Sequence, residues 1–476
     1  MTKNNKNLYL AIDQGGHASR AMLFNSNGEC IAQHTVAIDT LHSCDHCVEH
    51  DPEQLMQSIL TAIDQVVNDI DITNIVSAGL ATQRSSIVCW DRVTGKTLSP
   101  VISWQDTRTA RKIETLSDQA EFIHAETGLR LSAHYGASKL KWCLENLPGV
   151  QSAFEYKQLA MGPLASFIAY KLTREHMMFV DPTNATRTLL YNPATGNWSN
   201  SLMELFGVPE NVLPECVNNI SRFGHIQIRN HAVELNTVIG DQPAALFAYG
   251  SPQKEKVYIN LGTGAFLQMI CSSLPKDSMG LLKSIAFHDG SKPVYSIEGT
   301  VNGAGSALQW IANVLNLADS DFSLNDIPNS GIHVPLFINS VSGLGSPFWR
   351  SDVEPHFIGE GNAKEKLQSV VESIIFLIVE NLELFQKIKR CNQIVVSGGI
   401  STSDRFCQLL ADLAGKQVLR TSITEATARG TAWLSAGQPA NWPKPEITLQ
   451  CKPEDNPELL NRYIQWQEAM ERVLSR

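Results

Sequence analysis

The sequence lacks any dense cluster of positive charge. It contains 38 lysines and arginines against 48 aspartates and glutamates, which gives a formal net charge of −10. General nucleic-acid binders usually carry a basic face or run, so we expect no nucleic-acid partner. Long apolar runs are missing too, because the most apolar helix candidate, residues 373–380, is far shorter than a membrane span. With no apolar leader before the first expected strand, we expect a cytoplasmic protein that does not bind membranes.

The 10 cysteines are scattered, which is typical of reduced thiols rather than of a disulfide framework. The exception is the segment 42–50, where Cys44 and Cys47 are spaced like metal ligands and three histidines lie nearby. No second ligand pair of comparable spacing follows. The pattern favours a polar loop before a helix that starts near Asp51, and metal or redox roles stay open as alternatives.

Three common catalytic motifs are absent. Gly95-Lys96-Thr97 is similar to the end of a phosphate-binding P-loop, but Trp90 stands where the motif needs its first glycine. No Gly-x-Gly-x-x-Gly follows the first strand, which argues against a dinucleotide fold. No Gly-x-Ser-x-Gly occurs between a strand and a helix, which argues against a serine hydrolase.

What the sequence does contain is a pair of similar glycine hairpins half a chain apart, at 8–24 and 256–270. Each is an apolar strand, a polar residue, a short glycine turn and a second apolar strand. Glycine turns bring backbone N–H groups close to a bound anion. Two such turns facing each other could hold the phosphates of one nucleotide. With 476 residues the chain is long enough for two large domains, so the pair argues for a duplicated nucleotide-binding domain.

Hydrophobic periodicity predicts a mixture of strands and long helices. Strands are expected at 8–14, 18–25, 30–37, 75–81, 86–91 and 393–396, with a strand or hairpin region at 178–191 and a hairpin at 256–271. Helices are expected at 52–70, 107–116, 137–147, 161–173, 200–206, 302–316, 363–390, 404–415, 426–437 and 456–475. This mixture is α/β in character, and we expect the domain break between Gly240 and Lys256.

Several ordered motifs resemble one family. From about residue 8 to residue 437 the chain resembles the FGGY carbohydrate kinases, most closely the glycerol kinase branch. The resemblance is carried by residues 13–21, 82–96, 104–109, 181–188, 240–245, 260–264, 343–349 and 397–401.

The resemblance implies two actin-like (ribonuclease H-like) ATPase domains that flank a catalytic cleft. Residues 1–250 would form the substrate-binding domain and residues 251–476 the nucleotide-binding domain. Such kinases use ATP and Mg²⁺ to phosphorylate a hydroxyl of a small polyol or sugar. Whether the chain forms a homodimer stays open.

Two aspartates carry the chemistry in this interpretation. Asp241 follows Gly240 and would accept the hydroxyl proton as general base, and it would also lie near the metal. The alternative for an aspartate in this context is a helix N-cap, and both roles can hold at once. Asp13 ends the first strand and would hold Mg²⁺ through water. Its alternative is an ordinary turn-initiating aspartate.

The resemblance also implies the residues that contact the two substrates. The polyol or sugar would be held by Arg84, Ser85, Trp104, His134, Asp241, Gln242 and Phe266. The nucleotide would be held by Gly15, Gly16, His17, Arg20, Gly262, Thr263, Gly264, Gly305, Gln309, Gly398, Gly399 and Ser403. For His17 the alternative is a side chain that points to solvent, and for Arg20 a solvated arginine at a strand edge.

The chain departs from glycerol kinases at four places. Gly16-His17-Ala18 stands where they usually carry Thr-Thr-Ser, Ser85 where they carry glutamate, His134 where they carry tyrosine, and Ser403 where they often carry asparagine. Losing a charged hydrogen-bond partner typically costs about 1.5–3 kcal/mol. Serine at 85 also leaves room. A four- to six-carbon polyol or ketose therefore competes with glycerol as the substrate.

Two other functions stay open. The altered turn at Gly16-His17-Ala18 would suit a catalytically weak relative that senses a nucleotide or sugar, although Asp13, Asp241 and 262–264 are intact. A different actin-like ATPase, such as a chaperone or filament protein, is the other, but Trp104 and Trp349 suit a small-molecule pocket better.

Overall fold

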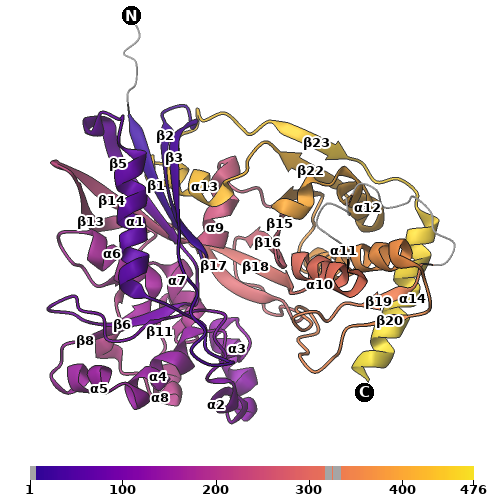
Figure 1. The fold of residues 1–476 in the computed structure, drawn as a ribbon, viewed down its shortest axis with the longest axis horizontal. Coiled ribbons are helices and arrows are strands. Elements are labelled where there is room, and N and C mark those ends of the chain that lie inside the picture. Colours follow the sequence, from indigo (N-terminus) through magenta and orange to yellow (C-terminus); the bar gives the residue numbers. More distant parts are fainter. Residues whose placement is uncertain (1–6, 317–323, 325–333, 476) are drawn as a thin grey trace, which may run out of the picture.

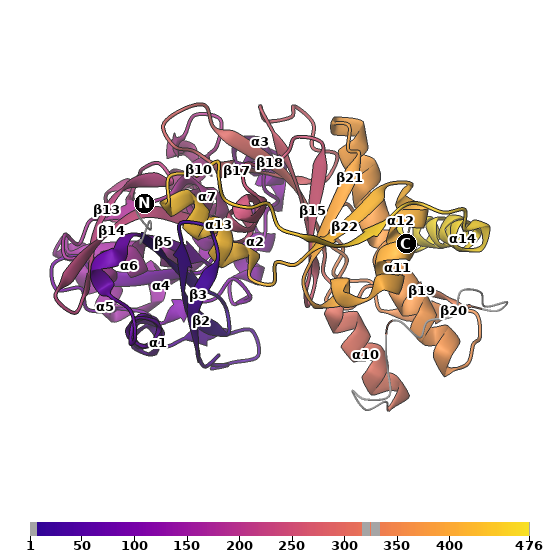
Figure 2. The same ribbon diagram turned by 90° about the horizontal axis from the view of Figure 1, so that it is seen from above.

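The computed structural model describes residues 7–316, 324 and 334–475 as two α/β bodies side by side, each built on a large mixed sheet (Figures 1 and 2). The first sheet has the order β13 (Ile220–Ile228), β14 (His231–Gly240), β5 (Ile75–Thr82), β1 (Leu8–Gln14), β2 (Ala18–Asn25) and β3 (Cys30–Ala37). The second has the order β17 (Leu282–Phe287), β18 (Val294–Val301), β16 (Ala265–Cys271), β15 (Lys256–Leu261), β21 (Gln393–Ser397), β22 (Gln417–Thr421) and β23 (Ile447–Cys451). The predicted two-domain α/β class is confirmed.

The two sheets repeat one topology. In each, a hairpin (β1–β2 or β15–β16) pairs antiparallel with a further strand, β3 or β18. On the other side of the hairpin's first strand lie two parallel strands, β5 and β14 or β21 and β22. The predicted duplication of the glycine hairpin is therefore a duplication of the whole sheet core.

Alternation along β1 explains how the first sheet is covered. Leu8, Leu10 and Ile12 point into the cluster that contains α1 (Pro52–Val66) and α6 (Leu164–Leu172). Ala11 points to the opposite face, where α9 (Asp241–Leu246) and α13 (Ala426–Ser435) pack. Because side chains alternate across a strand, both faces of this strand are apolar and both are buried.

The cluster around α9 and α13 also joins the two bodies. It contains Ala11 and Ala81 from the first sheet together with Tyr258 and Val395 from the second. Figure 1 shows α13, which comes late in the sequence, lying beside α9 and β1 of the body built mainly from the first half. The joint between the bodies is thus a shared apolar core.

The outer face of the second sheet is covered by long helices. They are α10 (Gly305–Leu315), α11 (Ala363–Ile388), α12 (Asp404–Ala414) and α14 (Pro457–Leu474). The apolar segment 373–380 lies inside α11, and most of its side chains are buried. Within the described residues, no helix combines the length and the apolar character needed to span a bilayer.

A third layer extends the first body. A small sheet runs β4 (Glu49–His50), β7 (Val101–Ile102), β6 (Ile87–Asp91) and β8 (Leu159–Pro163). Around it lie α2 (Ala110–Glu114), α3 (Ala120–Thr127), α4 (Gly136–Asn146), α5 (Pro148–Glu155), α7 (Pro182–Ala185) and α8 (Asn200–Phe206). Short strand pairs complete the fold: β9 (Phe179–Val180) with β12 (Glu215–Cys216), β10 (Tyr191–Asn192) with β11 (Asn197–Trp198), and β19 (Leu336–Ile338) with β20 (His356–Ile358).

One expectation is wrong. The region 178–191 is not a hairpin but α7 between two very short strands, because Asp181 caps that helix with its buried carboxylate. Cys44 and Cys47, for which metal or redox roles stayed open, form a disulfide. The other eight cysteines are free. Three groups of strands also escaped the sequence analysis, namely β13–β14, β17–β18 and β22–β23.

Candidate active site

Three adjacent parallel strands end at one edge of the first sheet. Asp13 lies opposite Ala81 in the β1–β5 pairing, and Gly240 lies opposite Thr82 in the β14–β5 pairing. The residues that follow or end these strands therefore meet. They are Asp13 from β1, Arg84 after β5 and Asp241 after β14. Ligands of α/β sheets commonly bind at the carboxyl ends of the strands, so this edge is the natural candidate site.

Asp241 opens α9 and faces an arginine. Its Oδ1 accepts a hydrogen bond from the Gln242 amide at 2.7 Å and lies 3.8 Å from Nε of Arg84. Gly240, not Asp241, occupies the N-cap position. Burial raises the pKa of Asp241, and the charges of Arg84 and Arg187 oppose that shift. The side chain stays 29% exposed, so a ligand can reach it.

Asp13 is buried, and its surroundings disfavour the charged form of its carboxylate. Burial raises its pKa to about 7, and the nearby Asp241 carboxylate adds to the shift, while Arg20 opposes it from 3.5 Å. Two carboxylates that disfavour each other's charge suit a divalent cation, which would relieve both. The described residues hold no group of three or more potential metal ligands. The pair fits Mg²⁺, which takes one or two carboxylates and leaves its other positions to water and phosphate.

A buried charge cluster joins the two bodies, and of its charged residues only Arg84 was predicted as part of the site. Glu298 of β18 is completely buried and forms ion pairs with Arg84, whose Nη1 is 3.5 Å from Oε1, and with Arg187. Ser296 also donates to Glu298 at 2.8 Å. Burial and the Arg84 charge lower the pKa of Arg187 to about 9. The guanidinium of Arg84 lies 5.5 Å from the centre of the Phe266 ring.

Sequence signals for this cluster existed but were not used. Arg187 lies within the 181–188 motif, and Glu298 is the single charged residue of β18, whose sequence is VYSIEGTV. Neither pattern says that the two side chains meet, because they belong to different bodies.

Two aromatic rings, those of Trp104 and His134, form a second group of predicted substrate contacts. The ring centres of Trp104 and His134 are 5.4 Å apart, and Trp104 is 38% exposed. Burial and the charge of Lys139 hold the pKa of His134 well below its usual range, so the imidazole is neutral. Ser85 is buried with a φ of 66°, and its hydroxyl has no hydrogen-bond partner within the described chain.

Lys139 links the segments that carry Trp104 and His134 through hydrogen bonds. Its ammonium donates to the carbonyl of Ser103 at 2.7 Å and to the carbonyl of His134 at 3.0 Å. The side chain is fully buried, and burial lowers its pKa to about 7. Lys139 is a further residue of the site that the sequence analysis missed.

The second glycine turn borders a cavity of about 750 Å³. Gly262, Thr263, Gly305, Gln309 and Gly399 line it, together with Leu261, Ser306, Trp310, Asn313, Val341 and Ile400. A Cβ on Gly305 would lie 2.7 Å from the Gly262 carbonyl, so only glycine lets α10 start this close to the turn. Five predicted nucleotide contacts therefore come together here.

The other predicted nucleotide contacts do not line this cavity. Gly264 and Gly398 belong to the same turns but do not line the cavity. Ser403 is buried and caps α12, where its hydroxyl accepts from the Phe406 amide at 3.1 Å. The first turn lies on the other body, where space around Gly16 is open and His17 is exposed. Arg20 pairs with Asp13 and, at 3.4 Å, with Glu425.

Gln242 and Phe266 meet between the bodies. Both line a cavity of about 20 Å³ with Asn260 and Ser397 of the second sheet. Of the predicted substrate contacts, the structure thus brings Arg84, Asp241 and Phe266 into one neighbourhood, and Trp104 with His134 into another.

Comparisons with known proteins show the family of the chain. Models of the FGGY family of carbohydrate kinases match the chain at residues 8–247, for the N-terminal domain, and 257–437, for the C-terminal domain. A glycerol kinase from Aquifex aeolicus is 29% identical over 487 residues, covering 98% of each chain. One from Citrifermentans bemidjiense is 32% identical over 442 residues, covering 90% of this chain and 89% of its own.

Solved structures share the fold. The Plasmodium falciparum glycerol kinase with ADP has a TM-score of 0.89 at 23% identity, and 98% of each chain is covered. A ligand-bound xylulose kinase from Lactobacillus acidophilus has a TM-score of 0.85 at 18% identity, again with 98% of each chain covered.

Proposed function

Since this chain belongs to the FGGY family of carbohydrate kinases, we propose that it transfers the γ-phosphoryl group of ATP to a hydroxyl of a small polyol or sugar with Asp241 as general base. The observation that carries the proposal is the meeting of Asp13, Arg84 and Asp241 at the carboxyl ends of three adjacent strands. Residues 1–250 would hold the sugar and 251–476 the nucleotide. The cavity bordered by Gly262 and Gly305 supports the second assignment.

In this mechanism the protein positions groups and moves one proton. Asp241, partly exposed and with a raised pKa, accepts the proton of the attacking hydroxyl. Arg84 lies beside the Asp241 carboxylate, and the ion pair with Glu298 holds the guanidinium of Arg84 in place. Asp13, with Asp241, would hold Mg²⁺, which neutralises phosphate charge during the transfer. Closure of the two bodies would then exclude water from the reacting atoms.

Trp104, His134 and Ser85 support a substrate longer than glycerol. The Ser85 hydroxyl is buried without a partner in the described residues, and a buried polar group in that state costs free energy unless a ligand satisfies it. A neutral His134 can both donate and accept a hydrogen bond. We propose that these groups meet the additional hydroxyls of a four- to six-carbon polyol or ketose.

ADP release with MgATP, measured against a panel of polyols and ketoses that includes glycerol, tests this proposal. Turnover of a longer substrate with a kcat/KM well above that for glycerol is expected. Preference for glycerol would contradict the proposed substrate class while leaving the kinase activity intact.

A catalytically weak sensor of a nucleotide or sugar is the second candidate. The first turn carries Gly16, the exposed His17 and Ala18 at positions where glycerol kinases usually have hydroxyl side chains. Saturable ATP binding with no ADP release for any member of the panel would favour this candidate over the kinase.

A further inference from the structure

The disulfide lies at the tip of an exposed loop, residues 41–49, which we call the cysteine loop. Leu41 and Glu49 exchange backbone hydrogen bonds of 2.8 and 2.9 Å, which close the loop at its base. Cys44 is exposed and Cys47 is half-buried. Among the eight free cysteines only Cys30 is exposed. A thiolate in solution can therefore reach the disulfide, and attack at this bond would be selective.

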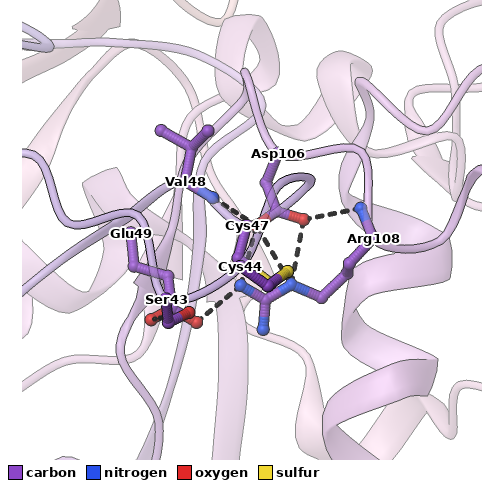
Figure 3. Close-up of a disulfide and its surroundings, with 7 residues drawn as sticks. All are labelled: Ser43, Cys44, Cys47, Val48, Glu49, Asp106 and Arg108. Carbon is purple, nitrogen blue, oxygen red and sulfur yellow. Dashed lines mark hydrogen bonds and ion pairs between the residues drawn. A yellow bond between two sulfur atoms is a disulfide. The ribbon is translucent and has the colours of Figure 1, made fainter.

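The second half of the cysteine loop is bonded to the segment that carries Trp104, residues 103–108, which we call the tryptophan loop. Figure 3 shows the bond between Val48 and Asp106. The Ser103 amide donates to the Val48 carbonyl at 2.9 Å, and the Thr107 amide donates to the His46 carbonyl at 3.0 Å. The Val48 amide donates to Oδ2 of Asp106 at 2.7 Å. All three bonds are made by His46 and Val48, the neighbours of Cys47 in the chain.

Buried ion pairs strengthen this contact. Asp106 is completely buried, and Arg108 donates to its two carboxylate oxygens at 2.7–3.0 Å. The same guanidinium reaches Oε1 of Glu49 at 2.5 Å (Figure 3). Glu49 also accepts from the Ser43 hydroxyl at 3.3 Å. The ends of the cysteine loop are thus held firmly, and its tip is held by the cross-link between Cys44 and Cys47 together with a hydrogen bond from the Cys47 amide to the Cys44 carbonyl at 3.0 Å.

The tryptophan loop is in turn hydrogen-bonded to the segment that carries His134. Lys139 donates to the Ser103 carbonyl and to the His134 carbonyl, and the Trp104 amide donates to the Ser86 hydroxyl at 3.0 Å. A chain of hydrogen bonds therefore runs from Val48, the neighbour of Cys47, through Ser103 and Lys139 to the backbone of His134, and Trp104 directly follows Ser103 in the chain.

We infer that Cys44 and Cys47 are a reversible redox site, open to exchange with dithiols, whose state changes how firmly the tryptophan loop holds the sugar. The inference about the sugar rests on the proposed function, but the redox site and its connection to the loop do not. Among the described residues no third potential ligand joins the two cysteines in a metal site.

The exchange is a two-electron reaction. A thiolate of a dithiol attacks the exposed sulfur of Cys44, the S–S bond breaks, and Cys47 leaves as a thiolate that takes up a proton. The second thiol of the dithiol then attacks its own partner sulfur in the mixed disulfide and releases Cys44. The dithiol becomes a disulfide, and the protein gains two electrons and two protons.

Reduction removes the cross-link that orders the tip of the cysteine loop. The amides of Ser103 and Thr107 then lose their fixed acceptors for part of the time, and the tryptophan loop moves more freely. We expect weaker sugar binding in the reduced protein, with KM for the sugar raised about fivefold, which corresponds to the loss of one hydrogen bond. The KM for ATP should change little, because the nucleotide cavity lies on the other body.

The first test needs no activity. The whole protein is equilibrated with oxidised or reduced dithiothreitol, alkylated with iodoacetamide and mapped by mass spectrometry, and amide hydrogen exchange of residues 103–108 is measured in both states. We expect Cys44 and Cys47 to convert together and reversibly, and exchange at 103–108 to be faster after reduction. The double variant Cys44→Ser/Cys47→Ser should exchange at the faster rate in both conditions, while Cys30→Ser should respond like the wild type.

The second test measures KM for the sugar that the substrate panel identifies, in the same two states. A pair that does not cycle between thiol and disulfide, or equal exchange at 103–108 in both states, would overturn the redox site and its connection. Faster exchange with an unchanged KM for the sugar would overturn the effect on substrate. Absence of turnover with every sugar would instead contradict the proposed function, and the first test would still decide the inference.

Discussion

Asp241 is partly open to solvent and, at the same time, paired with a buried arginine. We expect Asp241→Asn to lower kcat by about 10²–10⁴-fold, because the amide cannot accept the hydroxyl proton, while ATP affinity stays close to that of the wild type. Coupled ADP release and calorimetric ATP titration measure the two effects.

Asp51→Asn provides the matched control for Asp241→Asn. Asp51 is exposed and caps α1 through bonds from the Glu53 and Gln54 amides at 2.8 and 3.3 Å. Its replacement should change stability slightly and leave kcat unaltered. If Asp241→Asn behaved like Asp51→Asn, Asp241 would be a structural residue of the helix end and not the base.

Ser85 offers a test of substrate length. Ser85→Glu restores the carboxylate that the glycerol kinase pattern carries beside Arg84. We expect the ratio of kcat/KM for glycerol to that for the longer substrate to rise by roughly tenfold or more, as for one charged hydrogen bond gained. Ser85→Ala removes a hydroxyl that has no partner among the described residues. This variant should weaken the binding of the longer substrate and leave the binding of glycerol unchanged. An unchanged ratio in both variants would mean that position 85 does not contact substrate.

Lys139 predicts a pH dependence of stability. Its pKa is lowered to about 7 by burial, below the ordinary value of 10.5. The unfolded chain therefore binds more protons between pH 7 and 10.5, and this group's contribution to stability rises with pH across that window. The free energy of unfolding of the wild type relative to Lys139→Met should increase by a few kcal/mol, on the order set by the shift.

Denaturant unfolding at pH 6, 8 and 10 checks the Lys139 prediction. Lys141→Met, on the same helix α4, reports the effect of losing a lysine from outside the core. A constant difference between wild type and Lys139→Met across this range would show that the buried amine does not change its charge there.

At the scale of elements, α13 and α9 are packed backbone to backbone. A Cβ on Gly430 of α13 would overlap the Ala244 carbonyl of α9, the helix that begins with Asp241. Gly430→Ala must push the helices apart, and we expect a loss of at least about 1–3 kcal/mol in stability together with a fall in kcat as Asp241 shifts. Thermal melting and turnover measure both.

Gly149→Ala in α5 is the control for Gly430→Ala, because the nearest atom to its added Cβ would be Cδ2 of Leu98 at 3.8 Å. It should leave kcat unchanged. Normal turnover in a destabilised Gly430→Ala protein would show that the position of α9 tolerates more movement than the packing suggests.

At the scale of the whole molecule, the two glycine turns lie on different bodies, and the cavity beside Gly262 is lined by the second body alone. We expect one ATP to contact both turns and to draw the two bodies together. We expect the radius of gyration, measured by small-angle scattering, to fall when the sugar and a non-hydrolysable ATP analogue with Mg²⁺ bind together. An unchanged radius in a catalytically active protein would contradict closure.

Local patterns made much of the fold predictable. The hairpins at 8–24 and 256–270 were correctly expected, because alternation and a glycine turn are properties of a few neighbouring residues. The helices α11, α12 and α14 followed from three-and-four spacing. The prediction for the region 178–191 was wrong, because the buried Asp181 accepts hydrogen bonds both from the nearby Thr183 amide and from Asn219, which lies 38 residues further along the chain.

The sequence by itself determined the α/β class, the duplicated turns and the family motifs that contain Asp13 and Asp241, since each is written in a short run of residues. The tertiary structure alone decided that Glu298 neutralises Arg84 and Arg187, and that Cys44 and Cys47 are linked to each other and not to a metal. The physical reason is that burial and pairing of charges depend on which distant segments fold against one another, and a C-x-x-C spacing suits a metal and a disulfide equally well.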